Sequence, residues 1–355
     1  MSGQPTFSWL TLQSDRAPEP SGDSPTGWVQ PTTRHNLPGP LTTFMGRDKE
    51  IRALVALLSG AAPRLVTLTG PGGSGKTRLS LEVARSLLNV PHVFPDGVFV
   101  VDLAPISNPA LVMSATAQVL GVPEDEAGSD GGPGKRLQEY LLDRRLLLLL
   151  DNFEQVWFAG PQVTKLLTSA HGLKVLVTSR RVLEVEGEYE WSVPSLPQPA
   201  IQEPLQQLRQ SPAIDLFVTR ARAARTDFEL TQENALAVVE ICNRLDRLPL
   251  AIELAAAWIK RTTPQAMLRS STNPLDMARG GRRNVVQRLQ SMRDAINWSY
   301  ELLEVEEQRM FTRLAVFAGD FSLTAAEKIC AERRMTASST ALSTLCRCQP
   351  AGDAT

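Results

Sequence analysis

The chain has 355 residues, of which 43% are hydrophobic and 21% are charged, a composition typical of a globular protein with two or three domains. The formal net charge of −1 argues against a chain that binds nucleic acid or membrane surfaces through its overall charge. No apolar run reaches the roughly 18 residues of a membrane span, and the N-terminus lacks the basic-then-apolar pattern of a secretion signal. We therefore expect a cytoplasmic protein with no membrane partner.

The first segment of the chain, residues 1–40, is rich in Pro, Ser, Thr and Gly and has little hydrophobic periodicity. Such a composition predicts a disordered leader. The next segment, DKEIRALVALLS (Asp48–Ser59), repeats its apolar residues at helical spacing, which predicts a short amphipathic helix.

Apolar strand-like runs alternate with helical patterns between residues 41 and 210. This alternation predicts an α/β nucleotide-binding domain, with a parallel sheet that carries helices on both faces. The expected strands are Leu65–Thr69, Val98–Leu103, Leu146–Asp151, Leu173–Ser179 and Tyr189–Val193, and the expected helices lie at 77–88, 108–120, 135–144 and 161–170.

The first expected strand runs into GPGGSGKT (Gly70–Thr77), which fits the phosphate-loop pattern G-x-x-x-x-G-K-[ST]. Its glycines allow a tight turn that brings backbone N–H groups onto phosphate oxygens. Lys76 would reach the β- and γ-phosphates, the Thr77 hydroxyl would bind Mg²⁺, and the following helix would add its N-terminal dipole. A glycine turn with a chance lysine is the alternative, which the flanking strand and helix disfavour. We expect the nucleotide to contact Gly70, Gly72, Gly73, Ser74, Gly75, Lys76, Thr77 and Arg78.

A second motif, LLLLLDNFEQ (146–155), predicts a buried strand that ends in Asp151. A carboxylate at the carboxyl end of a central strand lies beside the phosphate loop, where it can hold Mg²⁺. The alternative is a helix N-cap that happens to follow a strand. Glu154 is the nearer candidate for activating water, although a surface carboxylate needs no such role, and Asn152 can orient a water but cannot abstract a proton. This weak supply of bases indicates slow hydrolysis.

The strand of LKVLVTSRR (173–181) ends beside Arg180, whose guanidinium could bind a γ-phosphate and report its presence. A surface arginine at a strand end is the alternative.

Strand signals stop at about Ser211, and helical patterns follow at 212–225, 232–246 and 249–260. Thr231 is the expected N-cap of the second helix. These patterns predict a separate helical domain over residues 211–270. The polar stretch 262–284 has a linker's composition, and we place a linker at 271–284, a further helical domain at 285–330 and a disordered tail at 331–355.

Taken together, the motifs resemble the STAND class of P-loop NTPases with an NB-ARC-like core, over Thr42 to Cys330. FMGRDKEI (44–51) is similar to the motif that opens this module, and Arg47 matches its arginine near the adenine. RLPLAIELAAAW (247–258) is similar to the family's G-L-P-L-A stretch, whose proline, here Pro249, lies against the nucleotide in relatives. Arg247 stands where the family has glycine, and it could either crowd the site or add a phosphate contact.

Residues 291–330 resemble the winged-helix segment of bacterial members, which are large LuxR-like or antibiotic-regulator-like transcriptional proteins. The resemblance implies ATP or ADP and Mg²⁺ as cofactors. In the family, bound ADP locks the module, and exchange for ATP opens it for self-association or for a partner protein. Because the family pattern stops after Cys330, we expect a truncated or frame-shifted product with a partial winged helix.

The leading functional hypothesis is a regulatory ATP/ADP switch with slow Mg-dependent ATP hydrolysis, within a bacterial transcriptional regulator or signalling protein. The alternatives are a metabolic P-loop enzyme such as a small-molecule kinase, which would need a second substrate domain, and a scaffold that binds nucleotide without turnover. Direct DNA binding is a weaker hypothesis, because the charge gives no electrostatic footprint.

Overall fold

The structure is a computed structural model that describes residues 35–122, 132–198, 204–270, 305–317 and 322–330. The expected leader up to residue 34, the linker at 271–284 and the tail at 331–355 lie outside the described residues. Within the described part of the chain, no helix is both long enough and apolar enough to cross a membrane.

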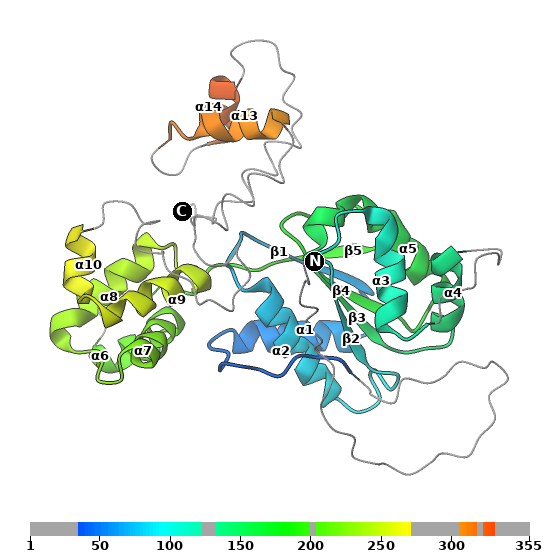
Figure 1. The fold of residues 1–355 in the computed structure, drawn as a ribbon, viewed down its shortest axis with the longest axis horizontal. Helices are drawn as coiled ribbons and strands as arrows, with labels where there is room; N and C mark the ends of the chain where they lie inside the picture. Colours follow the sequence, from blue (N-terminus) through cyan, green and yellow to red (C-terminus); the bar gives the residue numbers. More distant parts are fainter. Residues whose placement is uncertain (1–34, 123–131, 199–203, 271–304, 318–321, 331–355) are drawn as a thin grey trace, which may run out of the picture. The chain divides into compact units, whose positions relative to one another are not determined.

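A five-stranded parallel sheet forms the centre of the nucleotide-binding region (Figure 1). The strand order is β2-β3-β4-β1-β5. Every residue of β1, β3 and β4 is buried, as the continuous apolar runs of the sequence predict. The α/β class is thereby confirmed, and each expected strand is found within one residue at either end: β1 (Leu65–Thr69), β2 (Val98–Asp102), β3 (Leu147–Asp151), β4 (Lys174–Thr178) and β5 (Glu188–Ser192).

Helices cover both faces of this sheet, because successive strand residues point to opposite sides. Val66 and Leu149 share a core with Leu54 and Leu79, which come from the helices α1 and α2 on one face. The other helices lie across the sheet from them (Figure 1). The helices of this region are α1 (Asp48–Ser59), α2 (Lys76–Leu88), η1 (Pro109–Leu111), α3 (Val112–Val119), α4 (Gly132–Leu141), η2 (Phe153–Ala159) and α5 (Gly160–Ser169).

Two features of this region differ from the sequence prediction. The 3₁₀ helix η2 was not expected, and it forms because Phe153 and Val156 bury their side chains directly after β3. Residues 35–40, which composition assigned to the leader, include Asn36, whose side chain donates to the carbonyl of Val100 at 2.8 Å and accepts from its N–H at 2.7 Å. Composition alone does not reveal such pairing with a strand at the edge of a sheet.

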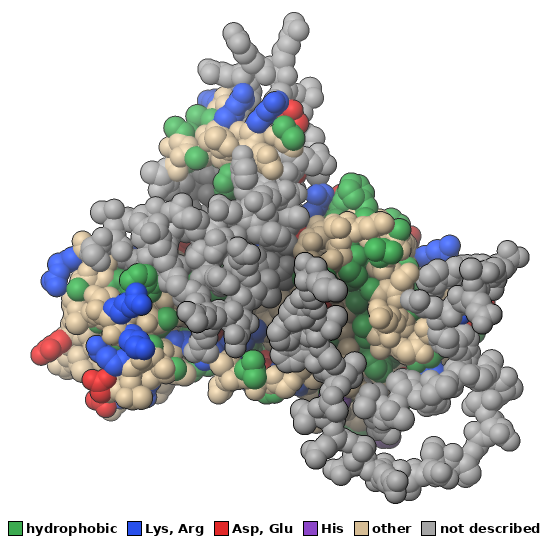
Figure 2. Space-filling model, viewed as in Figure 1, with side chains coloured by type: hydrophobic (Ala, Val, Ile, Leu, Met, Phe, Trp, Pro, Cys, Tyr) green, Lys and Arg blue, Asp and Glu red, His purple; other side chains and the backbone are tan. Residues whose placement is uncertain are grey.

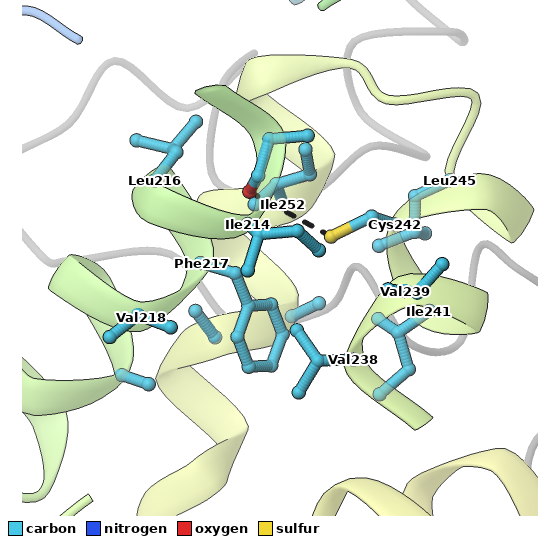
Figure 3. Close-up of a cluster of buried hydrophobic side chains, with 14 of the residues drawn as sticks. Ile214, Leu216, Phe217, Val218, Val238, Val239, Ile241, Cys242, Leu245 and Ile252 are labelled. Atoms are coloured by element: carbon cyan, nitrogen blue, oxygen red, sulfur yellow. Dashed lines mark hydrogen bonds between the residues drawn. The ribbon is translucent and has the colours of Figure 1, made fainter. Parts of the chain in front are cut away.

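A second apolar core lies among the helices after residue 204 (Figure 3). Phe217, Cys242 and Ile252 come from different helices and are all fully buried. Burial also raises the pKa of the Cys242 thiol to about 12, so this cysteine is an inert core residue. The helices are α6 (Leu205–Leu208), α7 (Pro212–Ala224), α8 (Gln232–Arg244), α9 (Pro249–Ala257), η3 (Trp258–Lys260) and α10 (Pro264–Ser270).

Helix α10 lies in the stretch whose polar composition suggested a linker. It forms because Thr263 accepts a hydrogen bond from the N–H of Ala266 at the helix start, at 3.2 Å, and because Met267 packs into the helical core. Basic and acidic side chains are interspersed on the surface of these helices (Figure 2). Further along, α13 (Val305–Leu314) and α14 (Leu323–Cys330) contact each other. The remainder of the expected winged-helix segment at 285–304 lies outside the described residues, so that assignment stays a prediction.

Candidate nucleotide-binding site

The phosphate loop joins β1 to α2 and depends on three glycines with positive φ. Gly70, Gly73 and Gly75 have φ of 146°, 82° and 91°, values at which a side chain is strained. A Cβ on Gly70 would also lie 2.9 Å from the carbonyl oxygen of Val193. Gly72 has no positive φ, so its backbone conformation does not itself require glycine. The loop is thus built from backbone that only glycine adopts easily.

Lys76 and the start of α2 supply the positive charge of the site. The Lys76 ammonium donates to the carbonyl oxygens of Gly70 at 2.7 Å and Pro71 at 3.1 Å, so it lies over the loop. Helix α2 begins with Gly75 as its N-cap, and no side chain caps it. Its first N–H groups are therefore suited to an anionic acceptor.

Asp151 and Thr77 lie together at the carboxyl edge of the sheet. Oδ1 of Asp151 accepts hydrogen bonds from the Thr77 hydroxyl at 2.8 Å and from the Thr178 hydroxyl at the end of β4. Oδ2 accepts from the side-chain amide of Asn152 at 2.9 Å, and this amide also donates to Asp102 at 3.1 Å. Thr178 was missed by the sequence prediction, although its place at the end of a strand next to β3 could have indicated it.

The Asp151 carboxyl is only 6% exposed, and this burial raises its pKa above the ordinary value of 3.8. The hydrogen bonds from Thr178 and Thr77 act in the opposite direction, and the charges of Asp102 and Glu154 raise the pKa further. A divalent cation bound at this edge of the sheet would offset the cost of burying the negative charge of Asp151.

Glu154 and Arg180, two residues expected to act on the nucleotide, contact each other. Nε of Arg180 lies 3.3 Å from Oε1 of Glu154, and the two side chains are 14% and 8% exposed. Neither is therefore a loose surface group. The contact holds the Glu154 side chain in one position beside Arg180.

The Arg47 side chain is hydrogen-bonded to the backbone of the phosphate loop. It is 6% exposed, and its Nη2 donates to the carbonyl oxygens of Ser74 at 2.9 Å and Pro194 at 2.6 Å. Burial lowers the pKa of this guanidinium from its ordinary value. Among the described residues, Nη1 of Arg47 and the hydroxyl of Ser74 are buried without a hydrogen-bond partner. Unpaired buried donors of this kind beside a phosphate loop fit a polar ligand.

The N-terminus of α9 rests on the same loop. The N–H of Leu250 donates to the carbonyl of Gly73 at 3.2 Å, and a Cβ on Gly73 would lie 3.0 Å from Cβ of Leu250. A Cβ on Gly75 would lie 3.8 Å from Cγ of Pro249. The sequence prediction that Pro249 belongs to the site thus has a geometric counterpart, because Pro249 lies next to the phosphate loop.

Arg78 points away from the loop. Its Nη1 pairs with Glu253 of α9 at 3.0 Å, and its Nη2 donates to the Thr42 hydroxyl at 2.9 Å. Its expected contact with the nucleotide therefore stays a prediction that the side-chain contacts do not favour. Glu253 could not be found from the sequence, because its partner Arg78 lies far away in the chain.

Arg247 neither crowds the loop nor points to it in the described contacts. Its φ is 54°, a left-handed conformation that glycine adopts at lower cost than arginine. Its Nε donates to the carbonyl of Leu196 at 3.2 Å, and its own carbonyl accepts from the N–H of Leu196 at 3.2 Å. Arg247 thus holds the segment that follows β5 in place through its two hydrogen bonds with Leu196.

The NB-ARC domain model matches residues 47–192. An uncharacterized protein of Mycobacterium tuberculosis is 36% identical over 306 residues, which cover 85% of this chain and 71% of that protein. The chain is an NB-ARC protein of the same family as this mycobacterial relative. This NB-ARC chain is also 38% identical over 272 residues to an M. tuberculosis protein provisionally named an HTH-type transcriptional regulator. Those residues cover 76% of the chain and 29% of the regulator, so the chain spans under a third of that relative's length.

Two solved structures that match the NB-ARC chain share little sequence with it. A STAND protein with a tetratricopeptide repeat sensor from Pyrococcus horikoshii is 15% identical, with a TM-score of 0.34 over 85% of this chain and 39% of that chain. The ADP form of the Aeropyrum pernix ORC2 protein is 14% identical, with a TM-score of 0.43 over 86% of this chain and 85% of that chain.

Proposed function

We propose that this chain is an ATP/ADP-binding switch with slow Mg-dependent ATP hydrolysis, and that it acts within a bacterial transcriptional regulator or signalling protein. The observation that carries the proposal is the placement of α9 on the phosphate loop, where Leu250 bonds directly to Gly73. A change of the ligand bound in the loop would therefore alter the contacts of α9 and of the helices that pack against it. A switch requires such differential contacts between its two states.

The residues of the site have separate roles in this proposal. The loop backbone and Lys76 would bind the phosphates. The positive φ angles of the loop glycines and the position of Lys76 over the loop support this role. Thr77 and Asp151 would hold Mg²⁺, which when bound neutralises phosphate charge. Arg47 and Pro249 would contact the nucleotide from the two sides of the loop, and Arg180 would bind the γ-phosphate.

Slow turnover follows from how the nearby carboxylates are engaged. Asp151 already accepts hydrogen bonds from Thr77, Thr178 and Asn152. Glu154, the candidate for activating water, is paired with Arg180. Because both carboxylates already have partners within the protein, neither is freely placed to activate a water, and we expect hydrolysis to be slow.

A metabolic kinase and a scaffold without turnover are the competing functions. For a kinase, the second substrate would need access to the loop, but α9 rests on the loop in this structure. A product phosphorylated in proportion to ATP consumption would favour the kinase. Nucleotide binding without any phosphate release would favour the scaffold.

Calorimetric titration of the full chain with Mg-ADP and Mg-ATP tests the proposal. We predict binding of one nucleotide per chain, and a loss of ATP affinity of about tenfold or more in Lys76→Ala, since a charge contact to phosphate is removed. Lys165→Ala, a change on α5 away from the loop, serves as the control. Equal ATP affinities of Lys76→Ala and the unchanged chain would contradict the proposed role of the loop.

A further inference from the structure

Glu253 lies one helical turn after Pro249, so the two residues share a face of α9. Its position is unusual because α9 otherwise carries mainly apolar residues, PLAIELAAA. An acidic residue in such a helix costs free energy unless it is paired. The contacts of Glu253 therefore indicate what it does.

Glu253 accepts hydrogen bonds from two arginines of different helices. Its Oε1 lies 3.0 Å from Nη1 of Arg78 and 3.1 Å from Nη2 of Arg220. Arg220 comes from α7 and its side chain is 11% exposed, while the side chains of Arg78 and Glu253 are 37% and 31% exposed. Glu253 thus joins α9 both to its own helical core and to α2.

Arg78 also fixes the segment that precedes α1. Its Nη2 donates to the hydroxyl of Thr42 at 2.9 Å and to the carbonyl of Thr43 at 3.1 Å, and its guanidinium lies 5.7 Å from the ring centre of Phe44. Arg78 immediately follows Thr77 in α2. A movement of α9 away from the loop would have to break the Arg78–Glu253 pair.

We infer that Glu253 is a positioning residue of the nucleotide site, which slows ADP release by holding α9 on the phosphate loop through Arg78. This inference rests on the proposed function. Glu253 does not touch the ligand in this account; it keeps Pro249 and Leu250 against Gly75 and Gly73. Its removal should therefore change the lifetime of the bound state more than the rate of binding.

The test is the dissociation rate of a fluorescent N-methylanthraniloyl-ADP from the full chain, chased with excess ADP. We predict that Glu253→Gln releases the probe about tenfold faster, with Arg78→Gln similar and the double variant no faster than either single variant. Glu240→Gln is the matched control, because Glu240 forms a comparable ion pair with Arg244 at 2.8 Å within α8. The control should release the probe at the unchanged rate.

Several outcomes would overturn the inference. Release at the unchanged rate from Glu253→Gln would refute it, and additive effects in the double variant would show that Arg78 and Glu253 act separately. If Glu253→Gln does not fold, as judged by its melting curve, Arg78→Lys tests the same contact and should also release the probe faster. Failure of the unchanged chain to bind the probe would instead remove the proposed function itself, and with it this inference.

Discussion

Folding and metal binding make opposite demands on Asp151, because burial favours its protonated form whereas Mg²⁺ would bind its ionised form. Its pKa is raised chiefly by burial, so the folded state prefers the protonated carboxyl. The stability that this preference provides is fully present below the unfolded pKa of about 4 and is lost as the pH rises through the raised folded pKa. At neutral pH the ionised side chain therefore destabilises the ligand-free protein.

We predict that the unchanged chain loses stability relative to Asp151→Asn as the pH rises from about 4 to 7 in metal-free buffer. Mg-ADP should stabilise the unchanged chain at pH 7 and stabilise the variant less. Urea unfolding at several pH values measures this, with Asp227→Asn as the control because the side chain of Asp227 is 81% exposed. A stability difference between the chain and Asp151→Asn that is constant with pH would contradict the account.

Arg247 shows how a departure from a family pattern is explained by backbone geometry. Its φ of 54° costs free energy in any residue with a side chain, and its hydrogen bond to Leu196 offsets part of that cost. We predict that Arg247→Gly changes the free energy of unfolding by less than about 1 kcal/mol, whereas Arg247→Val lowers it by about 1–3 kcal/mol because β-branched residues avoid this conformation. Urea denaturation of both variants would test this, and equal losses in the two would argue against the conformational explanation.

At the scale of secondary structure, the contact between α9 and the loop depends on the lack of a side chain at Gly73. We predict that Gly73→Ala weakens ADP binding by about tenfold or more, since its Cβ would press on Leu250 at 3.0 Å. Gly187→Ala is a matched control, because Gly187 has a similar φ of 77° but no neighbour within 4 Å of the added Cβ. Comparable losses of ADP affinity in both variants would show that backbone strain, and not the contact with α9, is responsible.

The regular elements could be predicted from the sequence because each has a strong local pattern. The strand runs and the helix Asp48–Ser59 have apolar periodicity or continuous apolar stretches that need no tertiary knowledge. Helices η2 and α10 could not be predicted, because their stability comes from buried residues such as Phe153 and Met267 that pack against distant parts of the chain. In addition, α10 lies in a stretch of polar composition, whereas η2 is too short for its apolar residues to show a helical period.

Some features of the candidate site could likewise be predicted from local sequence motifs, and others could not. The phosphate loop and Asp151 are carried by local motifs, so their proximity could be predicted, and Thr77 does bond to Asp151. The pairing of Glu154 with Arg180 and of Arg78 with Glu253 joins residues far apart in the chain. Such pairs depend on how side chains are oriented in the fold, which local sequence patterns do not show.

At the scale of the whole molecule, the described residues form two apolar cores that are connected by contacts beside the phosphate loop. One core contains the sheet with α1 and α2, and the other contains α7, α8 and α9. The backbone bond of Leu250 to Gly73 and the ion pair of Arg78 with Glu253 connect them.

The nucleotide that accompanies the purified protein tests the central claim most directly. The full chain and Lys76→Ala would be purified, denatured and analysed for released nucleotide. We predict ADP at about one per unchanged chain, because α9 closes on the loop, and much less in Lys76→Ala. No bound nucleotide in the unchanged chain, together with rapid ATP turnover, would contradict a locked switch and indicate an open P-loop enzyme.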